Sequence, residues 1–309
     1  MTTYLVFKGK GEINLQNKIA TPGATKELLK EYGIKLSKRL GQNFLVDSNI
    51  IDKIISAGNI SVDDNVIEIG PGIGSLTQAI LEKLGKGQLL AIEKDGRLVQ
   101  VLLDLFKDNN IKVINKDVMG IKWSEFFEEN NLTNQTVKVM ANLPYYITTP
   151  IIMGLLEARV PVEQYVFMVQ KEVAERMTAD PGGKDFGALS IAVQYFSSPE
   201  IVHIVPSSVF IPRPAVDSAI VKLTRNIKPP VQLEDELFFF QIIKAIFQQR
   251  RKNIKNGLVK AANIQLDKEL VLKSLDEMGL DKRIRGEKLD LKQLAQLSNL
   301  LYKNKFSLK

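Results

Sequence analysis

The sequence predicts an α/β fold, with a mostly parallel, Rossmann-like sheet covered by helices on both faces and a smaller all-helical domain after it. Short β-rich segments alternate with helical segments over residues 65–223, which is typical of a doubly wound sheet. A glycine-rich segment, residues 70–74, separates the first of these strands from the next helix. Pro229 and Pro230 then punctuate the chain, and helical periodicity takes over.

Each element is assigned from the spacing of apolar residues and from the residues that begin or end it. The part before the sheet comprises a loose extension (2–18), a helix (25–32) ended by Gly33, a basic loop (35–45) and a helix (47–57). The expected strands are 65–69, 88–92, 111–114, 136–141, 164–170, 200–205 and 218–223. The expected helices between and after them are 75–84, 96–105, 149–157, 237–254, 268–278 and 291–301.

Net charge divides the chain into three parts. Residues 1–40, an N-terminal extension and basic segment, carry a net charge of +5. Residues 41–225, the expected sheet domain, carry −5, and residues 226–309, the expected helical domain, carry +7. Because two basic ends flank an acidic middle, the pattern favours a polyanion such as a nucleic acid as the partner.

Composition excludes several kinds of protein. The chain has no cysteine, so disulfides, thiolate metal sites and a cysteine nucleophile are excluded. The single histidine, His203, lies in an apolar strand-like run and is expected to be structural, which argues against a zinc or haem site. No apolar run approaches the ~18 residues that span a bilayer, and residues 1–18 lack a secretory signal pattern. We expect a cytoplasmic protein without a metal and without membrane contact.

The glycine-rich segment has a spacing that suits a cationic ligand. A nicotinamide site would have Gly-x-Gly-x-x-Gly, with a pyrophosphate over the start of the helix. Here the pattern is Glu68, Gly70, Gly72 and Gly74 at every second position, and Glu68 ends the strand. A carboxylate there would repel a pyrophosphate. It suits S-adenosylmethionine, which carries an ammonium group, a sulfonium and a ribose.

Two further acids follow the next two strands. Glu93 comes 21 residues after Gly72, at a strand end where a carboxylate can accept hydrogen bonds from both ribose hydroxyls. Asp117 follows the third strand, where an adenine amino group could be bound. Any one of these acids alone is better explained as a solvated surface carboxylate. Together with the glycine spacing, they indicate a cofactor site.

The segment Asn142-Leu143-Pro144-Tyr145 suggests methyl transfer to an exocyclic amine. Adenine N6 is a poor nucleophile because its lone pair is delocalised into the ring, so the protein must position it. The Asn142 oxygen and a backbone carbonyl can accept the N6 hydrogens, Pro144 stiffens the turn, and Tyr145 offers a flat face for the base. The alternative is an ordinary turn between a strand and a helix. The glycine segment makes the methyltransferase interpretation the stronger one.

These residues closely resemble the KsgA family of ribosomal RNA adenine dimethyltransferases, from about Ile19 into the C-terminal helices. The motifs that carry the resemblance are residues 40–45 (LGQNFL), the glycine segment, residues 142–147 (NLPYYI) and residues 209–218 (VFIPRPAVDS). The resemblance implies an S-adenosylmethionine-dependent enzyme that dimethylates two adjacent adenines in a hairpin loop near the 3′ end of small-subunit (16S) rRNA. Its implied partner is the small-subunit rRNA of the maturing (pre-30S) subunit.

The resemblance also adds site residues. In the family the segment that matches residues 41–45 closes over the cofactor, so Asn43 and Leu45 join the expected cofactor residues. The aromatic that matches Phe210 lies beside the target base, although a core phenylalanine that caps the sheet is the simpler alternative.

The basic run Arg250, Arg251, Lys252 and Lys255 is expected to bind RNA phosphates, the alternative being a solvated helix face. We expect a monomer. Two rival functions remain: the related 23S rRNA adenine methyltransferase that gives macrolide resistance, and a non-catalytic ribosome-assembly or transcription factor on the same fold.

Overall fold

The computed structural model describes residues 6–8, 12–14, 18–36, 41–248, 252–262 and 264–306. The chain forms two compact units, Met1–Ala174 with Glu200–Arg225, and Glu175–Pro199 with Asn226–Lys309. The sequence analysis placed residues 175–199 with the sheet, whereas here they belong to the second unit. Each unit has its own apolar core.

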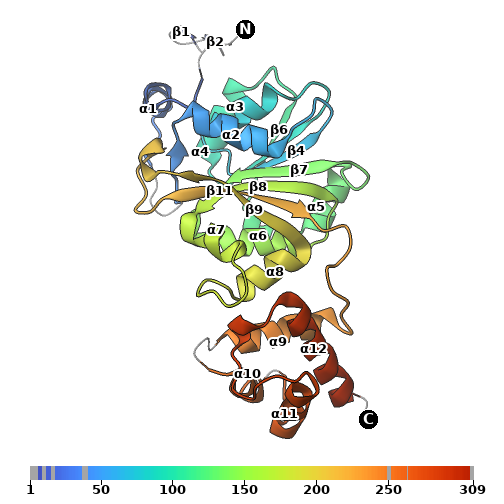
Figure 1. Ribbon diagram of the computed structural model, residues 1–309. Coiled ribbons are helices and arrows are strands. Elements are labelled where there is room, and N and C mark those ends of the chain that lie inside the picture. Colours follow the sequence, from blue (N-terminus) through green and yellow to red (C-terminus); the bar gives the residue numbers. More distant parts are fainter. Residues whose placement is uncertain are drawn as a thin grey trace. The chain divides into compact units, whose positions relative to one another are not determined.

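A seven-stranded sheet organises the first unit, with strand order β6-β5-β4-β7-β8-β11-β9. The first five of these run parallel to their neighbours, and β11 pairs antiparallel with β8. Helices α2, α3 and α4 cover one face and α5 and α6 the other (Figure 1). The strands are β4 (Asn65–Ile69), β5 (Leu89–Glu93), β6 (Ile111–Asn115), β7 (Val137–Asn142), β8 (Val162–Gln170), β9 (Ser197–Val205) and β11 (Ser218–Arg225). The mostly parallel sheet predicted from the sequence is confirmed.

The helices of this unit follow from their sequences. In α2, isoleucines at positions 50, 51, 54 and 55 form one buried stripe, and the Asp47 carboxylate caps the first turn by accepting the backbone N–H of Asn49 at 2.8 Å. The stripe packs on Val66 of β4 and Met168 of β8. The helices are α1 (Pro22–Glu31), α2 (Ser48–Gly58), α3 (Ser75–Leu81), α4 (Gly96–Leu105), α5 (Trp123–Glu129), α6 (Thr148–Glu157) and α7 (Lys171–Met177), which runs on into the second unit.

The parallel part of the sheet decides where a site can form. Strands β4, β5, β6 and β7 all point the same way, so their carboxyl ends meet at one edge. Polar residues placed after these strands therefore come together although they are far apart in the sequence. This edge is where ligands bind in open α/β sheets.

Several short elements were not predicted. Strands β1 (Val6–Lys8) and β2 (Glu12–Asn14) pair antiparallel where a loose extension was expected; other parts of that extension lie outside the described residues. The expected basic loop contains β3 (Phe44–Leu45), which pairs with β10 (Phe210–Ile211). Two-residue strands have no periodicity to detect. Helix α5 and helix α8 (Ala188–Phe196) were also missed.

The second unit is helical and has a core of its own. It contains α8 together with α9 (Glu236–Gln248), α10 (Ile254–Val259), α11 (Lys268–Glu277) and α12 (Leu291–Phe306). The single helix expected over 237–254 is wrong: Asn253 is extended and accepts the backbone N–H of Asn256 at 2.9 Å, which starts a new helix. Phe239, Ile242, Leu294 and Leu301 fill the core. In the described part of the chain, no helix has the length and apolar character needed to cross a membrane.

Candidate active site

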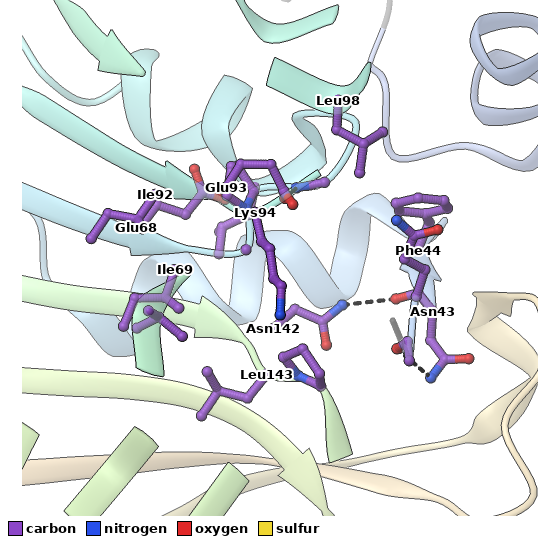
Figure 2. Close-up of a pocket in the computed structure, with 18 of the residues that line it drawn as sticks. Asn43, Phe44, Glu68, Ile69, Ile92, Glu93, Lys94, Leu98, Asn142 and Leu143 are labelled. Atoms are coloured by element: carbon purple, nitrogen blue, oxygen red, sulfur yellow. Dashed lines mark hydrogen bonds between the residues drawn. The ribbon is translucent and has the colours of Figure 1, made fainter. Parts of the chain in front are cut away.

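A cavity at the carboxyl edge of the sheet brings the expected cofactor and base residues together. It encloses about 1070 Å³ of space between protein atoms, part of it open to solvent, which is ample for a nucleoside-sized ligand. Figure 2 shows the side chains that converge on it from separate strands. The expected residues that line it are Asn43, Leu45, Glu68, Gly70, Gly72, Glu93, Asp117, Asn142, Leu143, Pro144 and Tyr145.

The glycine segment turns the chain from β4 into α3. Gly70, Gly72 and Gly74 have φ angles of 67°, 62° and 91°, in the left-handed region that favours glycine. A Cβ atom at Gly72 would also lie only 2.9 Å from the ring of Phe44, which packs across the turn. Both the backbone conformation and this close packing therefore require glycine at position 72.

Glu93 ends β5 and is fixed by two backbone donors. Its Oε2 accepts the N–H of Gly72 at 3.2 Å, and its Oε1 accepts the N–H of Asp95 at 2.8 Å. Burial raises the pKa of Glu93, and these hydrogen bonds oppose the shift. Each oxygen retains a lone pair, so the carboxylate can still accept a pair of ribose hydroxyls.

Glu68 lies deeper, one residue before the end of β4, and is only 1% exposed. The hydroxyl of Thr77, on α3, donates to its Oε2 at 2.6 Å. Burial raises the pKa of the Glu68 carboxyl to about 8; the bond from Thr77 opposes this shift, and the charge of Glu93 adds to it. The carboxyl is therefore mostly protonated at pH 7, and a cation bound in the cavity would favour its ionised form.

Asp117 follows β6 and is ionised. It accepts a 2.6 Å ion pair from the Lys94 ammonium and the backbone N–H of Met119 at 3.1 Å. The hydrogen bond from Lys94 lowers the pKa of this carboxyl. Lys94 also lines the cavity, and the sequence analysis did not identify it.

Asn142, the last residue of β7, has a fixed amide orientation. Its Nδ2 donates to the backbone oxygen of Asn43 at 2.9 Å, as Figure 2 shows. Because that bond consumes an amide hydrogen, the Oδ1 atom is left as the acceptor at this point of the cavity. The arrangement matches the predicted need for an acceptor beside an exocyclic amine.

The residues after Asn142 form a rigid turn, the 3-10 helix η3 (Tyr145–Ile147). The Pro144 carbonyl accepts the Thr148 hydroxyl at 3.0 Å and the Ile147 N–H at 3.2 Å. The Tyr145 hydroxyl lies 2.6 Å from the Ser218 hydroxyl of β11, which anchors the far end of the ring. Tyr145 is half-buried, so part of its ring remains available to the cavity.

Residues 41–45 line the cavity and connect it to two other parts of the unit. The Gln42 amide donates to Asp95 at 3.0 Å, next to Glu93, and β3 pairs with β10. The sequence signal for these residues was the family motif alone. Gln42 and Thr77 were not predicted as functional, because a glutamine in a loop and a threonine on a helix carry no spacing signal.

Phe210 does not line the cavity. Its side chain is 2% exposed and packs with Leu45, Val205 and Ile220 in the core beneath the edge of the sheet. This is the placement of the simpler alternative, a core phenylalanine.

Of the basic run, Arg250 and Arg251 lie outside the described residues. Lys252 is exposed and Lys255 is half-buried at the start of α10. Among the described residues, no group of three or more His, Cys, Asp or Glu side chains is placed to hold a metal ion.

Comparison with known proteins agrees with this geometry. The profile of the ribosomal RNA adenine dimethylase family matches residues 33–302. A protein of Halothermothrix orenii named Ribosomal RNA small subunit methyltransferase A is 55% identical over 285 residues, which cover 92% of this chain and 94% of that one. Its namesake in Geobacillus thermodenitrificans is 48% identical, with 92% and 97% covered.

Two solved structures are also similar over most of the chain. One is a dimethyladenosine transferase from Plasmodium falciparum, with a TM-score of 0.69 and 28% identity, covering 85% of this chain and 98% of that one. The other is the 23S rRNA methyltransferase ErmE, with a TM-score of 0.64 and 26% identity, covering 84% and 100%. With the family profile spanning nearly all of the chain, this protein belongs to the ribosomal RNA adenine dimethylase family.

Proposed function

We propose that the protein transfers methyl groups from S-adenosylmethionine to N6 of two adjacent adenines in the 3′-terminal hairpin loop of small-subunit rRNA, giving N6,N6-dimethyladenosine. The observation that carries this proposal is the Asn142 amide, held by the Asn43 carbonyl in the cavity that Glu68, Glu93 and Asp117 line. The identities of 55% and 48% to small-subunit enzymes, against 26% to a large-subunit enzyme, favour the small subunit as the target.

The residues of the cavity fit the cofactor. Glu93 would accept the ribose hydroxyls, Asp117 would accept the adenine amino group, and Glu68 lies near enough to favour a cationic group. The positive φ angles of Gly70 and Gly72 let the backbone approach the ligand closely. When bound, the cofactor supplies a methyl group on a sulfonium, already an excellent leaving group. The protein therefore needs no strong base.

The protein's contribution to the reaction is to orient the amine. The Asn142 Oδ1 and a backbone carbonyl of residues 142–145 would accept the two N6 hydrogens, which aims the nitrogen lone pair at the methyl group. The Pro144 carbonyl already accepts two hydrogen bonds, so the Leu143 carbonyl is the better partner. Tyr145, held by Ser218, would stack on the base, an interaction worth ~1–3 kcal/mol.

The remaining assignments concern RNA. Residues 41–225 would form the catalytic domain and residues 226–309 the RNA-binding domain, with Arg250, Arg251, Lys252 and Lys255 contacting phosphates. Phe210 would serve as the second aromatic at the target base only if its segment shifts, since it is buried here. The protein would act as a monomer in the cytoplasm, on the maturing small subunit.

Methylation of purified subunits tests the proposal. Small and large subunits from cells that lack both methylations are incubated with the protein and S-adenosylmethionine, and the digested rRNA is analysed by mass spectrometry. We expect dimethyladenosine at two adjacent positions in the small subunit, lost in N142A, which should bind the cofactor nearly as well as the wild type. Modification of the large subunit alone would indicate the macrolide-resistance activity, and no modification of either would indicate a non-catalytic role.

A further inference from the structure

Tyr146 is an aromatic side chain that the proposed function does not use. Its side chain is 57% exposed, and among the described residues the only other aromatic in the exposed class is Phe306, in the second unit. Tyr146 follows Tyr145 within η3 and lines the same cavity. A large apolar ring left in solvent beside a ligand cavity indicates a binding role.

The ring is held on one side by the protein. A Cβ atom built on Gly41 would lie 3.0 and 3.1 Å from two carbons of the Tyr146 ring and 3.5 Å from Cβ of Pro144. Gly41 has a φ angle of 62°, so glycine is favoured there for its backbone as well as for this close approach. The ring therefore rests against the backbone of residue 41, and its exposed part faces away from that support.

The backbone that carries Tyr146 is also fixed. The Pro144 carbonyl is bonded to Thr148 and to Ile147 on either side of the turn, and Tyr145 is anchored to Ser218. Two neighbouring aromatic side chains thus project from one rigid turn, one into the cavity and one at its mouth. Aromatic side chains of this kind stack with bases of any sequence, because every base has a π face.

We propose that Tyr146 is a second stacking position, which binds the nucleotide next to the target adenine. This inference rests on the proposed function, in which the substrate has two adjacent adenines. A base that enters the cavity must leave its stack, and its neighbour stays tethered to it by a single phosphodiester link. That neighbour therefore comes to the mouth of the cavity, where Tyr146 offers an apolar surface to replace the lost stacking.

A purely structural role predicts something different. If Tyr146 only packs on Gly41 to keep residues 41–45 over the cofactor, any side chain of similar volume should serve, and its loss should weaken cofactor binding. The variants Y146F, Y146L and Y146A separate the two roles. Phe keeps the flat ring, Leu keeps apolar contact with Gly41 without a π face, and Ala keeps neither.

The experiment measures kcat/KM for unmethylated small subunits, calorimetric affinity for S-adenosylmethionine, and thermal unfolding for each variant. We expect Y146L and Y146A to lose about 5- to 150-fold in kcat/KM, the range for one lost stacking contact, while Y146F stays close to wild type. Cofactor affinity and the unfolding temperature should be unchanged.

Wild-type activity in Y146L, or a parallel loss of cofactor affinity, would overturn the inference and leave a packing role. A wild-type protein that leaves small subunits unmethylated would instead refute the proposed function, and this inference with it. The two failures are therefore distinguishable in one set of measurements.

Discussion

Replacing Glu68 with Gln should change how the stability of the protein depends on pH. The carboxyl is 1% exposed, and its main partner is the Thr77 hydroxyl at 2.6 Å. Folding raises its pKa from 4.5 to about 8, chiefly through burial. Gln has nearly the same shape and can accept the same hydrogen bond, but it does not ionise.

The sign and size of the effect follow from proton linkage. Between pH 4.5 and 8 the carboxyl is protonated in the folded chain and ionised in the unfolded chain. Each unit rise in pH within that window therefore lowers the free energy of unfolding by up to ~1.4 kcal/mol. From pH 5 to pH 8 the wild type should lose about 3–4 kcal/mol through this group, a loss that E68Q lacks.

Urea denaturation of the cofactor-free protein at pH 5, 6, 7 and 8 would measure this difference. The quantity of interest is the free energy of unfolding of E68Q minus that of the wild type, which should rise steadily with pH and level off above about 8. E163Q, at an exposed glutamate of β8, controls for the loss of a carboxylate. A difference that is flat across this range would show that Glu68 is ionised in the folded protein and would refute the reasoning.

Three further substitutions test the site. E93A should weaken S-adenosylmethionine binding by ~1.5–3 kcal/mol, roughly ten- to a hundredfold, and an unchanged calorimetric dissociation constant would place the ribose elsewhere. F210A should lower the free energy of unfolding by ~3–5 kcal/mol because the ring is 2% exposed; normal methylation by this variant at low temperature would exclude a base-stacking role. Changing both Lys252 and Lys255 to Gln should flatten the salt dependence of RNA binding by ~0.7–0.9 per phosphate contact, whereas an unchanged slope would indicate a solvated face.

The central part of the site could be predicted because it depends on local patterns. Strand β4 is short and bounded by the glycine segment, and Glu68 and Glu93 lie at the ends of strands that must be parallel neighbours in an alternating α/β chain. Once the strands are parallel, their carboxyl ends meet and the acids come together. The position of Asn142 after β7 follows from the same rule.

The rest depends on contacts between distant segments, which leave no periodic signal. The pairing of β3 with β10 involves two residues on each strand, and it is this pairing that buries Phe210 beside Leu45. A Phe-x-Pro-x-Pro pattern shows that the chain is extended but not which way the ring points. In the second unit, helix α8 is apolar on most of its surface, so its sequence shows no contrast between faces.

The order of strands in the sheet separates the residues for the methyl donor from those for the acceptor. Glu93 and Asp117 follow β5 and β6, on one side of β4, whereas Asn142 and Tyr145 follow β7, on the other side. The segment after β7 can therefore vary in length and sequence while the donor pocket stays unchanged. Evolution of new acceptors on this scaffold, or their design by exchanging residues 142–147, needs to alter only one half of the sheet edge.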